Sequence, residues 1–118
     1  MKITSVEAAT CVVPLERGVA ISTRAIRERH YTLVRIRTDS GAESIGFCYG
    51  GTRAGHLSTL AVRDLLRPSV LGRDPHQVEA IWDSMFRESL LQGRRGSVLR
   101  AISAIDIALW DLVSRDAG

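Results

Sequence analysis

Two aspartates near the end of the chain, Asp106 and Asp111, are the carboxylates whose spacing most suggests a shared site. Paired carboxylates can hold a divalent cation or transfer protons when their oxygens face one another. On a helix, however, a separation of five residues turns the two side chains roughly 140° apart, at about 100° per residue. The pair therefore predicts salt bridges at a helix terminus or an interface rather than a metal site.

The histidines and cysteines are also poorly spaced for chemistry. His30, His56 and His76 are too scattered for a ligand set, and each is expected at the surface or at a strand end. Cys11 and Cys48 have no Cys or His partner at metal-ligand spacing. Two thiols in a domain with an adequate core are usually reduced packing residues, so no disulfide is expected.

The composition is that of a single globular domain. The chain has 118 residues, of which 45% are hydrophobic and 25% charged, with a net charge of +3. No apolar stretch is long enough to cross a membrane, and no apolar segment follows Lys2 as in a secretory signal. We therefore expect a cytoplasmic protein. Arginines crowd between residues 17 and 37, but no nucleic-acid-binding motif accompanies them, which makes nucleic acid a minor hypothesis.

The first half of the chain has the pattern of strands. Alternating and β-branched residues predict three strands, at about 3–13, 30–38 and 43–49. Asp39-Ser40-Gly41 is a tight-turn signature between the second strand and the third. Residues 15–29 are expected to form a long irregular loop. Such a loop is either functional or an ordinary flexible excursion, and both readings stay open.

The second half has the pattern of three helices, at about 54–66, 75–90 and 98–115. The expected fold is therefore α+β: a three-stranded antiparallel meander followed by a three-helix bundle. In the last helix, Ile107, Trp110 and Val113 lie off the main apolar stripe, so its apolar surface extends around much of the circumference. This predicts that a further structure packs against the helix.

The last helix also carries the most specific motif of the chain. Residues 101–112 read AISAIDIALWDL and resemble the A-x-S-A-I-D-x-A-L-W-D-L hallmark of mandelate racemase and muconate lactonizing enzymes. Residues 38–41 with Gly46 resemble the T-D-x-G-x-x-G-x-G-E hairpin of the same enzymes, although Ser44 and Phe47 replace a glycine and the glutamate. The resemblance spans the whole chain and identifies it as an N-terminal capping domain of the enolase superfamily.

The resemblance implies that residues 1–118 form only the cap of a larger enzyme. In such enzymes a (β/α)7β barrel follows the cap, and it is absent from this chain. The barrel carries the acid/base residues and the three carboxylates that bind Mg²⁺. We therefore expect no catalytic residue and no metal ligand in this chain, with Mg²⁺ bound by the barrel of the full-length enzyme. The fragment alone is expected to be inactive.

The resemblance also implies a reaction and a substrate class. The full-length enzyme would abstract the proton α to a carboxylate, as a racemase, an acid-sugar dehydratase or a cycloisomerase, and Mg²⁺ would stabilise the resulting enediolate. The loops at 15–29 and 48–54 would fold over the barrel mouth, exclude water and contact the substrate. The expected substrate-binding residues in these loops are Ile21, Ser22, Thr23, Arg24 and Tyr49.

Each of these residues has a simpler reading. Arg24 could pair with a distal carboxylate or hydroxyl of the substrate, or it could be a solvated loop charge like Arg27 and Arg29. Ile21 and Tyr49 could form an apolar lid wall, or they could pack the loops onto the sheet.

The partners expected from the resemblance are the chain's own C-terminal barrel, a small carboxylate or acid-sugar substrate, and further copies in a homo-oligomer. Neither nucleic acid nor a membrane is expected as a partner. The alternative hypothesis is a stand-alone interaction or oligomerisation module that has the cap fold and no catalytic activity.

Overall fold

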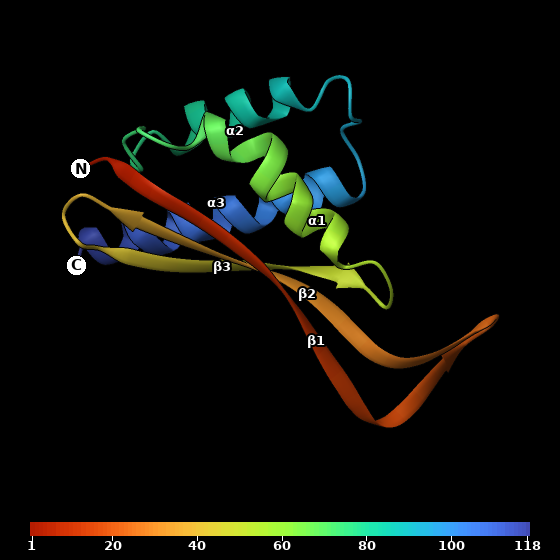
Figure 1. Ribbon diagram of the computed structural model, residues 1–118. Coiled ribbons are helices and arrows are strands. Elements are labelled where there is room, and N and C mark those ends of the chain that lie inside the picture. Colours follow the sequence, from red (N-terminus) through yellow and green to blue (C-terminus); the bar gives the residue numbers. More distant parts are fainter.

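A computed structural model describes all residues 1–118 and has the predicted α+β architecture (Figure 1). Its sheet is antiparallel, with strand order β1-β2-β3. The strands are β1 (Ile3–Ile21), β2 (Arg24–Thr38) and β3 (Glu43–Gly51). The helical elements are α1 (His56–Leu60), a π-helical turn η1 (Ala61–Leu66), a 3₁₀ turn η2 (Arg67–Ser69), α2 (Val78–Glu88) and α3 (Ser97–Asp116).

The helices cover one face of the sheet, and the alternation along β2 determines which face it is. Thr32, Val34 and Ile36 are fully buried, whereas Leu33 and Arg35 point to the opposite, exposed face. The buried side of the sheet joins a core of 18 apolar residues, to which α3 contributes seven. The opposite side, here called the outer face, carries no helix.

Helix α3 approaches the sheet most closely at Gly46. A Cβ atom added to Gly46 would lie 2.0 Å from the carbonyl oxygen of Ala104 and 2.6 Å from the backbone nitrogen of Ala108. Only glycine on β3 and small residues on α3 allow the two backbones to come this close. This contact aligns α3 along β3.

Each edge of the sheet is hydrogen-bonded at one place to the helical half of the chain. On the β1 edge, the Ile3 N–H donates to the carbonyl of Arg73 at 2.9 Å, and the Gly72 N–H donates to the carbonyl of Ile3 at 2.8 Å. On the β3 edge, the Ile45 N–H donates to Asp111 Oδ2 at 3.2 Å, and Arg115 donates to the carbonyl of Glu43 at 3.2 Å. Asp111 also pairs with Arg115, which confirms the salt bridge expected near the helix terminus.

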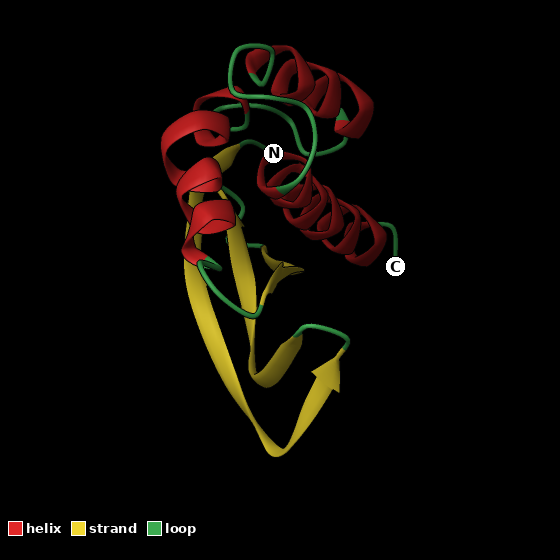
Figure 2. Ribbon diagram, turned by 90° about the vertical axis from the view of Figure 1, so that its right-hand side faces the viewer, coloured by secondary structure: helices red, strands yellow, loops and turns green.

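Residues 15–29 are not an irregular loop, and this part of the expectation was wrong. Strands β1 and β2 continue through them as a β-hairpin, which closes in a two-residue turn at Ser22 and Thr23. We call residues 12–30 the arm. The arm projects beyond the helices and bends (Figures 1 and 2). The bend falls where the register shifts from the Pro14–Glu28 pair to the Val19–Ile26 pair.

The helix boundaries differ from the expectation in two places. Helix α2 begins at Val78 rather than near residue 75, because the Asp74 carboxylate accepts the His76 N–H at 3.0 Å and closes a turn there instead of capping the helix. The first expected helix is divided into α1 and the wider π-helical turn η1, and it starts at His56.

Candidate functional site

The candidate site lies at the end of the sheet where the arm leaves the body and β3 runs into α1 (Figure 2). Two segments that were expected to contact the substrate lie at this end of the sheet: the arm, and the turn between Gly51 and Gly55. No helix covers the arm, so its side chains are exposed on both faces over most of its length. Any surface that this end presents to a ligand is therefore built from these two segments and the strand residues between them.

Four of the five residues expected to bind substrate form the tip of the arm. Ile21 pairs with Arg24 across the hairpin, and Ser22 and Thr23 make the turn between them. All four side chains are exposed, and Arg24 forms no ion pair with any carboxylate of the chain. The guanidinium of Arg24 is therefore free to bind an anion.

The fifth residue, Tyr49, lies on the body of the sheet. It pairs with Tyr31 on β2, and the two rings meet edge to face with centroids 5.8 Å apart. The Arg100 guanidinium of α3 lies 5.8 Å from the centre of the Tyr49 ring. Tyr31, Tyr49 and Arg29 line a shallow depression of about 280 Å³. Tyr49 thus belongs to a cluster of aromatic and basic side chains.

The structure does not bring Tyr49 and the arm tip together. Strand β2 runs about 23 Å from Arg24 to Tyr31, at roughly 3.3 Å per residue. Tyr31, Arg29 and Arg100 were not expected as neighbours of Tyr49. The pairing of Tyr31 with Tyr49 could have been found from the sequence. Arg37 and Glu43 flank the predicted turn and pair with each other, and counting six residues outward along each strand leads to Tyr31 opposite Tyr49.

The arginines between residues 17 and 37 divide into two groups. Arg35 binds Glu7 at 2.6 Å and Arg37 binds Glu43 at 2.7 Å, all on the outer face of the sheet. The hydrogen bond from Arg35 lowers the pKa of Glu7, and the hydrogen bond from Arg37 lowers the pKa of Glu43. The remaining arginines of this segment lie in the arm and form no ion pair: Arg17, Arg24, Arg27 and Arg29.

The chain offers no donor set for a divalent cation. No three His, Cys, Asp or Glu side chains gather where they could hold a metal ion. Asp111 is paired with Arg115, and Asp106 stands alone on α3, where partial burial raises its pKa. Cys11 and Cys48 are free thiols, and burial raises the pKa of Cys48. These residues do not fit Mg²⁺, which requires several oxygen ligands around one point.

Helix α3 keeps an unpartnered apolar surface away from the sheet. Ile107 and Trp110 are exposed, and the Trp110 side chain retains 55% of its accessible area. A shallow groove beside Trp110 is lined by Val113 and by the first turn of α2. None of the helices is long and apolar enough to cross a membrane.

An open antiparallel sheet with helices on one face and a hairpin arm beyond them defines an α+β domain of the capping type. The chain belongs to the mandelate racemase / muconate lactonizing enzyme family, whose N-terminal domain profile it matches over residues 3–118.

Individual relatives support the same assignment. The chain is 39% identical over 101 residues to 3,6-anhydro-alpha-L-galactonate cycloisomerase of Streptomyces coelicolor, covering 85% of this chain and 28% of that protein. It is 34% identical to D-galactarolactone cycloisomerase of Agrobacterium fabrum, covering all of this chain and 30% of that protein.

Solved structures show the same fold. A racemase from Streptomyces coelicolor with bound magnesium superposes with a TM-score of 0.93 at 36% identity, over 98% of this chain and 32% of that one. L-Talarate dehydratase from a Polaromonas species, complexed with Mg and L-glucarate, gives a TM-score of 0.91 at 28% identity, over 99% of this chain and 33% of that one. The chain therefore spans about a third or less of the length of the proteins it matches.

Proposed function

We propose that this chain is the capping and substrate-specificity domain of a Mg²⁺-dependent enzyme that abstracts the proton α to a carboxylate, of the racemase, acid-sugar dehydratase or cycloisomerase type. The observation that carries the proposal is the arm: an exposed hairpin with four unpaired arginines, at the same end of the sheet as the Tyr49 cluster. A surface of this kind suits an anionic, hydroxylated substrate, and the relatives include enzymes named for acid sugars.

The residues of the cap would bind and orient the substrate and exclude water from it. Arg24 at the arm tip would donate to a distal carboxylate or hydroxyl, with Ser22 and Thr23 beside it. Ile21 would supply apolar cover, and Tyr49 would close the other side. Removal of water strengthens every electrostatic interaction in a closed site, which is how a cap without catalytic groups contributes to the rate.

The chemical step would take place in a C-terminal barrel rather than in the cap. The acid/base groups and the Mg²⁺ ligands would come from a C-terminal barrel, since this chain has no metal-donor cluster. Mg²⁺ bound there would stabilise negative charge that develops on the substrate carboxylate. The exposed Trp110 surface of α3 is the part of this domain that we expect the barrel to cover.

The test of the activity is proton exchange in the full-length protein. The protein is incubated with Mg²⁺ in D₂O together with a panel of aldonic and aldaric acids, and the α-proton signal is followed by NMR. All three reaction types begin with loss of this proton, so its exchange or disappearance is expected for at least one acid. If no acid of the panel loses its α-proton, the proposed function is wrong.

The test of the cap is a comparison of two arginine variants in the full-length enzyme. Arg24→Gln is expected to raise KM about tenfold for an aldaric acid, since the loss of one charge-assisted hydrogen bond is worth about 1.5 kcal/mol. KM for an aldonic acid, which has no distal carboxylate, should change much less. Arg87→Gln is the matched control, because Arg87 is exposed on α2 and pairs only with Asp83. If the Arg24 and Arg87 variants have equal KM values for the aldaric acid, Arg24 does not contact the substrate.

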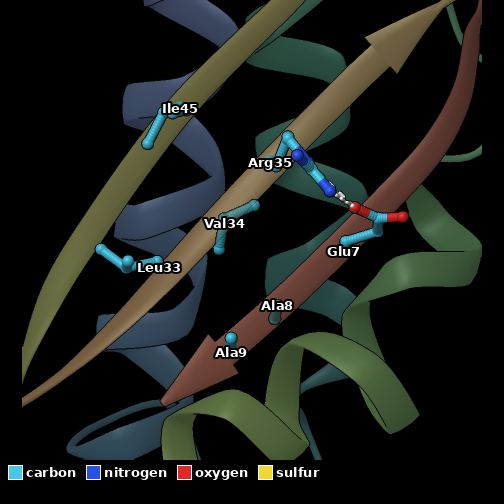
Figure 3. A pocket seen from close by; sticks show the side chains of 7 residues that line it. All are labelled: Glu7, Ala8, Ala9, Leu33, Val34, Arg35 and Ile45. Atoms are coloured by element: carbon cyan, nitrogen blue, oxygen red, sulfur yellow. Dashed lines mark hydrogen bonds and ion pairs between the residues drawn. The ribbon is translucent and has the colours of Figure 1, made fainter. Parts of the chain in front are cut away.

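We also propose that the full-length protein is a homo-oligomer and that the outer face of the sheet takes part in the contact. Ile45 and Phe47 keep 54% and 53% of their area exposed there. Small alanines on β1 leave a depression of about 410 Å³ beside Leu33 and Ile45, bordered by the Glu7–Arg35 ion pair (Figure 3). Apolar patches of this kind favour a protein partner.

Light scattering of the full-length protein tests the oligomer. Phe47→Lys is expected to lower the mass toward that of a monomer. Leu91→Lys is the control because Leu91 is 90% exposed in a loop outside this patch. A monomeric wild-type protein would overturn the proposal.

The same features favour a cytoplasmic enzyme acting on a small acid rather than on nucleic acid or at a membrane. On the outer face Arg35 and Arg37 are neutralised by Glu7 and Glu43, so the unpaired arginines of the strands all lie in the arm. A salt-dependent affinity for DNA or RNA would count against this expectation.

A further inference from the structure

The turn between β3 and α1 holds a strained backbone. Ala54 has a φ of +53° and is the only residue other than glycine with positive φ in the chain. The left-handed conformation is unfavourable for alanine and persists only when the surroundings hold it in place. Strain of this kind is concentrated at binding sites, and this turn lies beside Tyr49 at the candidate site.

The next residue, Gly55, is held on both sides of its Cα by side chains of β2. Its N–H donates to Nδ1 of His30 at 3.1 Å, and its carbonyl accepts from Oγ1 of Thr32 at 3.4 Å. Thr32 in turn contacts the Thr59 hydroxyl of α1 at 2.9 Å. A Cβ added to Gly55 would lie 2.3 Å from Cβ of His30, so only glycine fits. His30 and Thr32 thus determine where the turn sits on the sheet.

The second nitrogen of His30 faces the arm. Since Nδ1 accepts the Gly55 N–H, the ring proton lies on Nε2, which donates to Glu28 Oε1 at 3.0 Å. Glu28 pairs with Pro14, the last regular pair before the register shift at the bend of the arm. The His30 side chain is only 13% exposed. One nearly buried imidazole therefore touches both the turn and the base of the arm.

We propose that His30 is a positioning residue that couples the Gly51–Gly55 turn to the arm and so fixes the position of the arm relative to the Tyr49 cluster. The inference rests on the proposed function for its effect on substrate binding. The coupling itself is a property of the fold. His30 touches no reacting atom, and its effect is transmitted through Gly55 on one side and Glu28 on the other.

Two substitutions separate the two contacts. In His30→Asn, the amide oxygen lies near the position of Nδ1 and can still accept the Gly55 N–H, but the link to Glu28 is lost. In His30→Gln, the longer amide reaches the position of Nε2 and can still donate to Glu28, but the Gly55 N–H loses its acceptor. His56→Asn is the control, since His56 follows Gly55 directly, is exposed and forms no hydrogen bond through its side chain.

The measurement is hydrogen–deuterium exchange of the full-length protein, together with kcat and KM for an acid sugar. His30→Gln should speed hydrogen exchange of the Gly55 amide about tenfold, because the lost hydrogen bond is worth about 1.4 kcal/mol. Exchange of the arm amides should stay as in the wild type. His30→Asn should speed exchange in the arm and leave the turn protected. Both should raise KM several-fold while kcat changes less than twofold, and His56→Asn should behave as the wild type.

The outcomes separate the coupling from the proposed function. If no acid sugar is turned over, the proposed function fails, and the exchange patterns of the two variants still decide the coupling. If turnover is normal and both His30 variants keep the wild-type KM and exchange, the coupling is refuted while the function stands. If His30→Asn does not fold, Glu28→Ala replaces it and must speed exchange in the arm; wild-type exchange in the arm of this variant would refute the coupling.

Discussion

Replacement of Gly46 by alanine is the sharpest test of how the domain is held together. The new Cβ would lie 2.0 Å from the carbonyl oxygen of Ala104 and 2.6 Å from the nitrogen of Ala108. Carbon–oxygen contacts are normally above 3 Å, and both obstructing atoms belong to the backbone of α3. No side-chain rotation can relieve the overlap, so the helix must move away from β3 by about 1 Å.

The size of the effect follows from what α3 buries. Seven of its residues are buried in the core, and a shift of the helix weakens the packing of all of them. Over-packing of a core usually costs about 1–3 kcal/mol, and a backbone clash lies at the upper end of that range or above it. For a chain of this length, with an unfolding entropy of roughly 250 cal/mol/K, about 3 kcal/mol corresponds to a fall in Tm of about 12 °C.

The assay is urea and thermal unfolding followed by circular dichroism, with Gly18→Ala as the matched control. Gly18 lies in the arm, and its added Cβ would meet only the carbonyl oxygen of Ile26 at an ordinary 3.6 Å. The control should therefore change the free energy of unfolding by less than about 0.5 kcal/mol. A Gly46→Ala protein within 1 kcal/mol of the wild type would refute the close backbone contact between β3 and α3.

Three further changes test other contacts. Ser44→Ala should raise the urea midpoint, by the equivalent of about 1 kcal/mol, because the Ser44 hydroxyl is buried without a hydrogen-bond partner; a lower midpoint would show that a partner exists. Thr59→Val should lower the free energy of unfolding by about 1–3 kcal/mol, measured by the same unfolding experiment, since it removes the hydroxyl that contacts both Thr32 and Thr10. Hydrogen bonds to Asp74 and then Asp116 raise the pKa of His76 above 6.5. The stability that His76 contributes should therefore be complete below pH 6.5 and be lost as the pH rises through the raised pKa. The Tm difference between wild type and His76→Gln should accordingly shrink as the pH rises above 6.5; a constant difference would exclude the titration.

Much of the body of the domain follows from local patterns in the sequence. Thr32, Val34 and Ile36 share one face of the strand predicted at about 30–38, and the structure shows that this face is the buried one. The Asp39–Gly41 turn set the register of β2 against β3. The apolar stripe at 98–115 predicted the helix itself, because a helix that packs against a core must repeat its apolar positions every three to four residues.

The arm could not be predicted in this way, and neither could the contacts of the candidate site. Both faces of the arm are solvated, so its strands show no apolar alternation, and Pro14 and Gly18 resemble the boundaries of a loop. The pairing that forms the arm is fixed by the backbone rather than by burial. The roles of His30 and Arg100 arise from segments distant in sequence: His30 meets Gly55, and Arg100 reaches Tyr49 from another element. No local spacing encodes such contacts.

The covered edges of the sheet have a consequence for how the protein behaves at high concentration. An open strand edge offers backbone donors and acceptors to another chain and is the usual starting point of edge-to-edge aggregation. Here Gly72 and Arg73 occupy one edge, and Asp111 and Arg115 occupy the other, with charged groups at both. Recruitment of a foreign strand is therefore hindered at Ile3 on one edge and at Glu43 and Ile45 on the other. Along the arm, the four unpaired arginines repel an identical arm while leaving an anionic ligand free to approach.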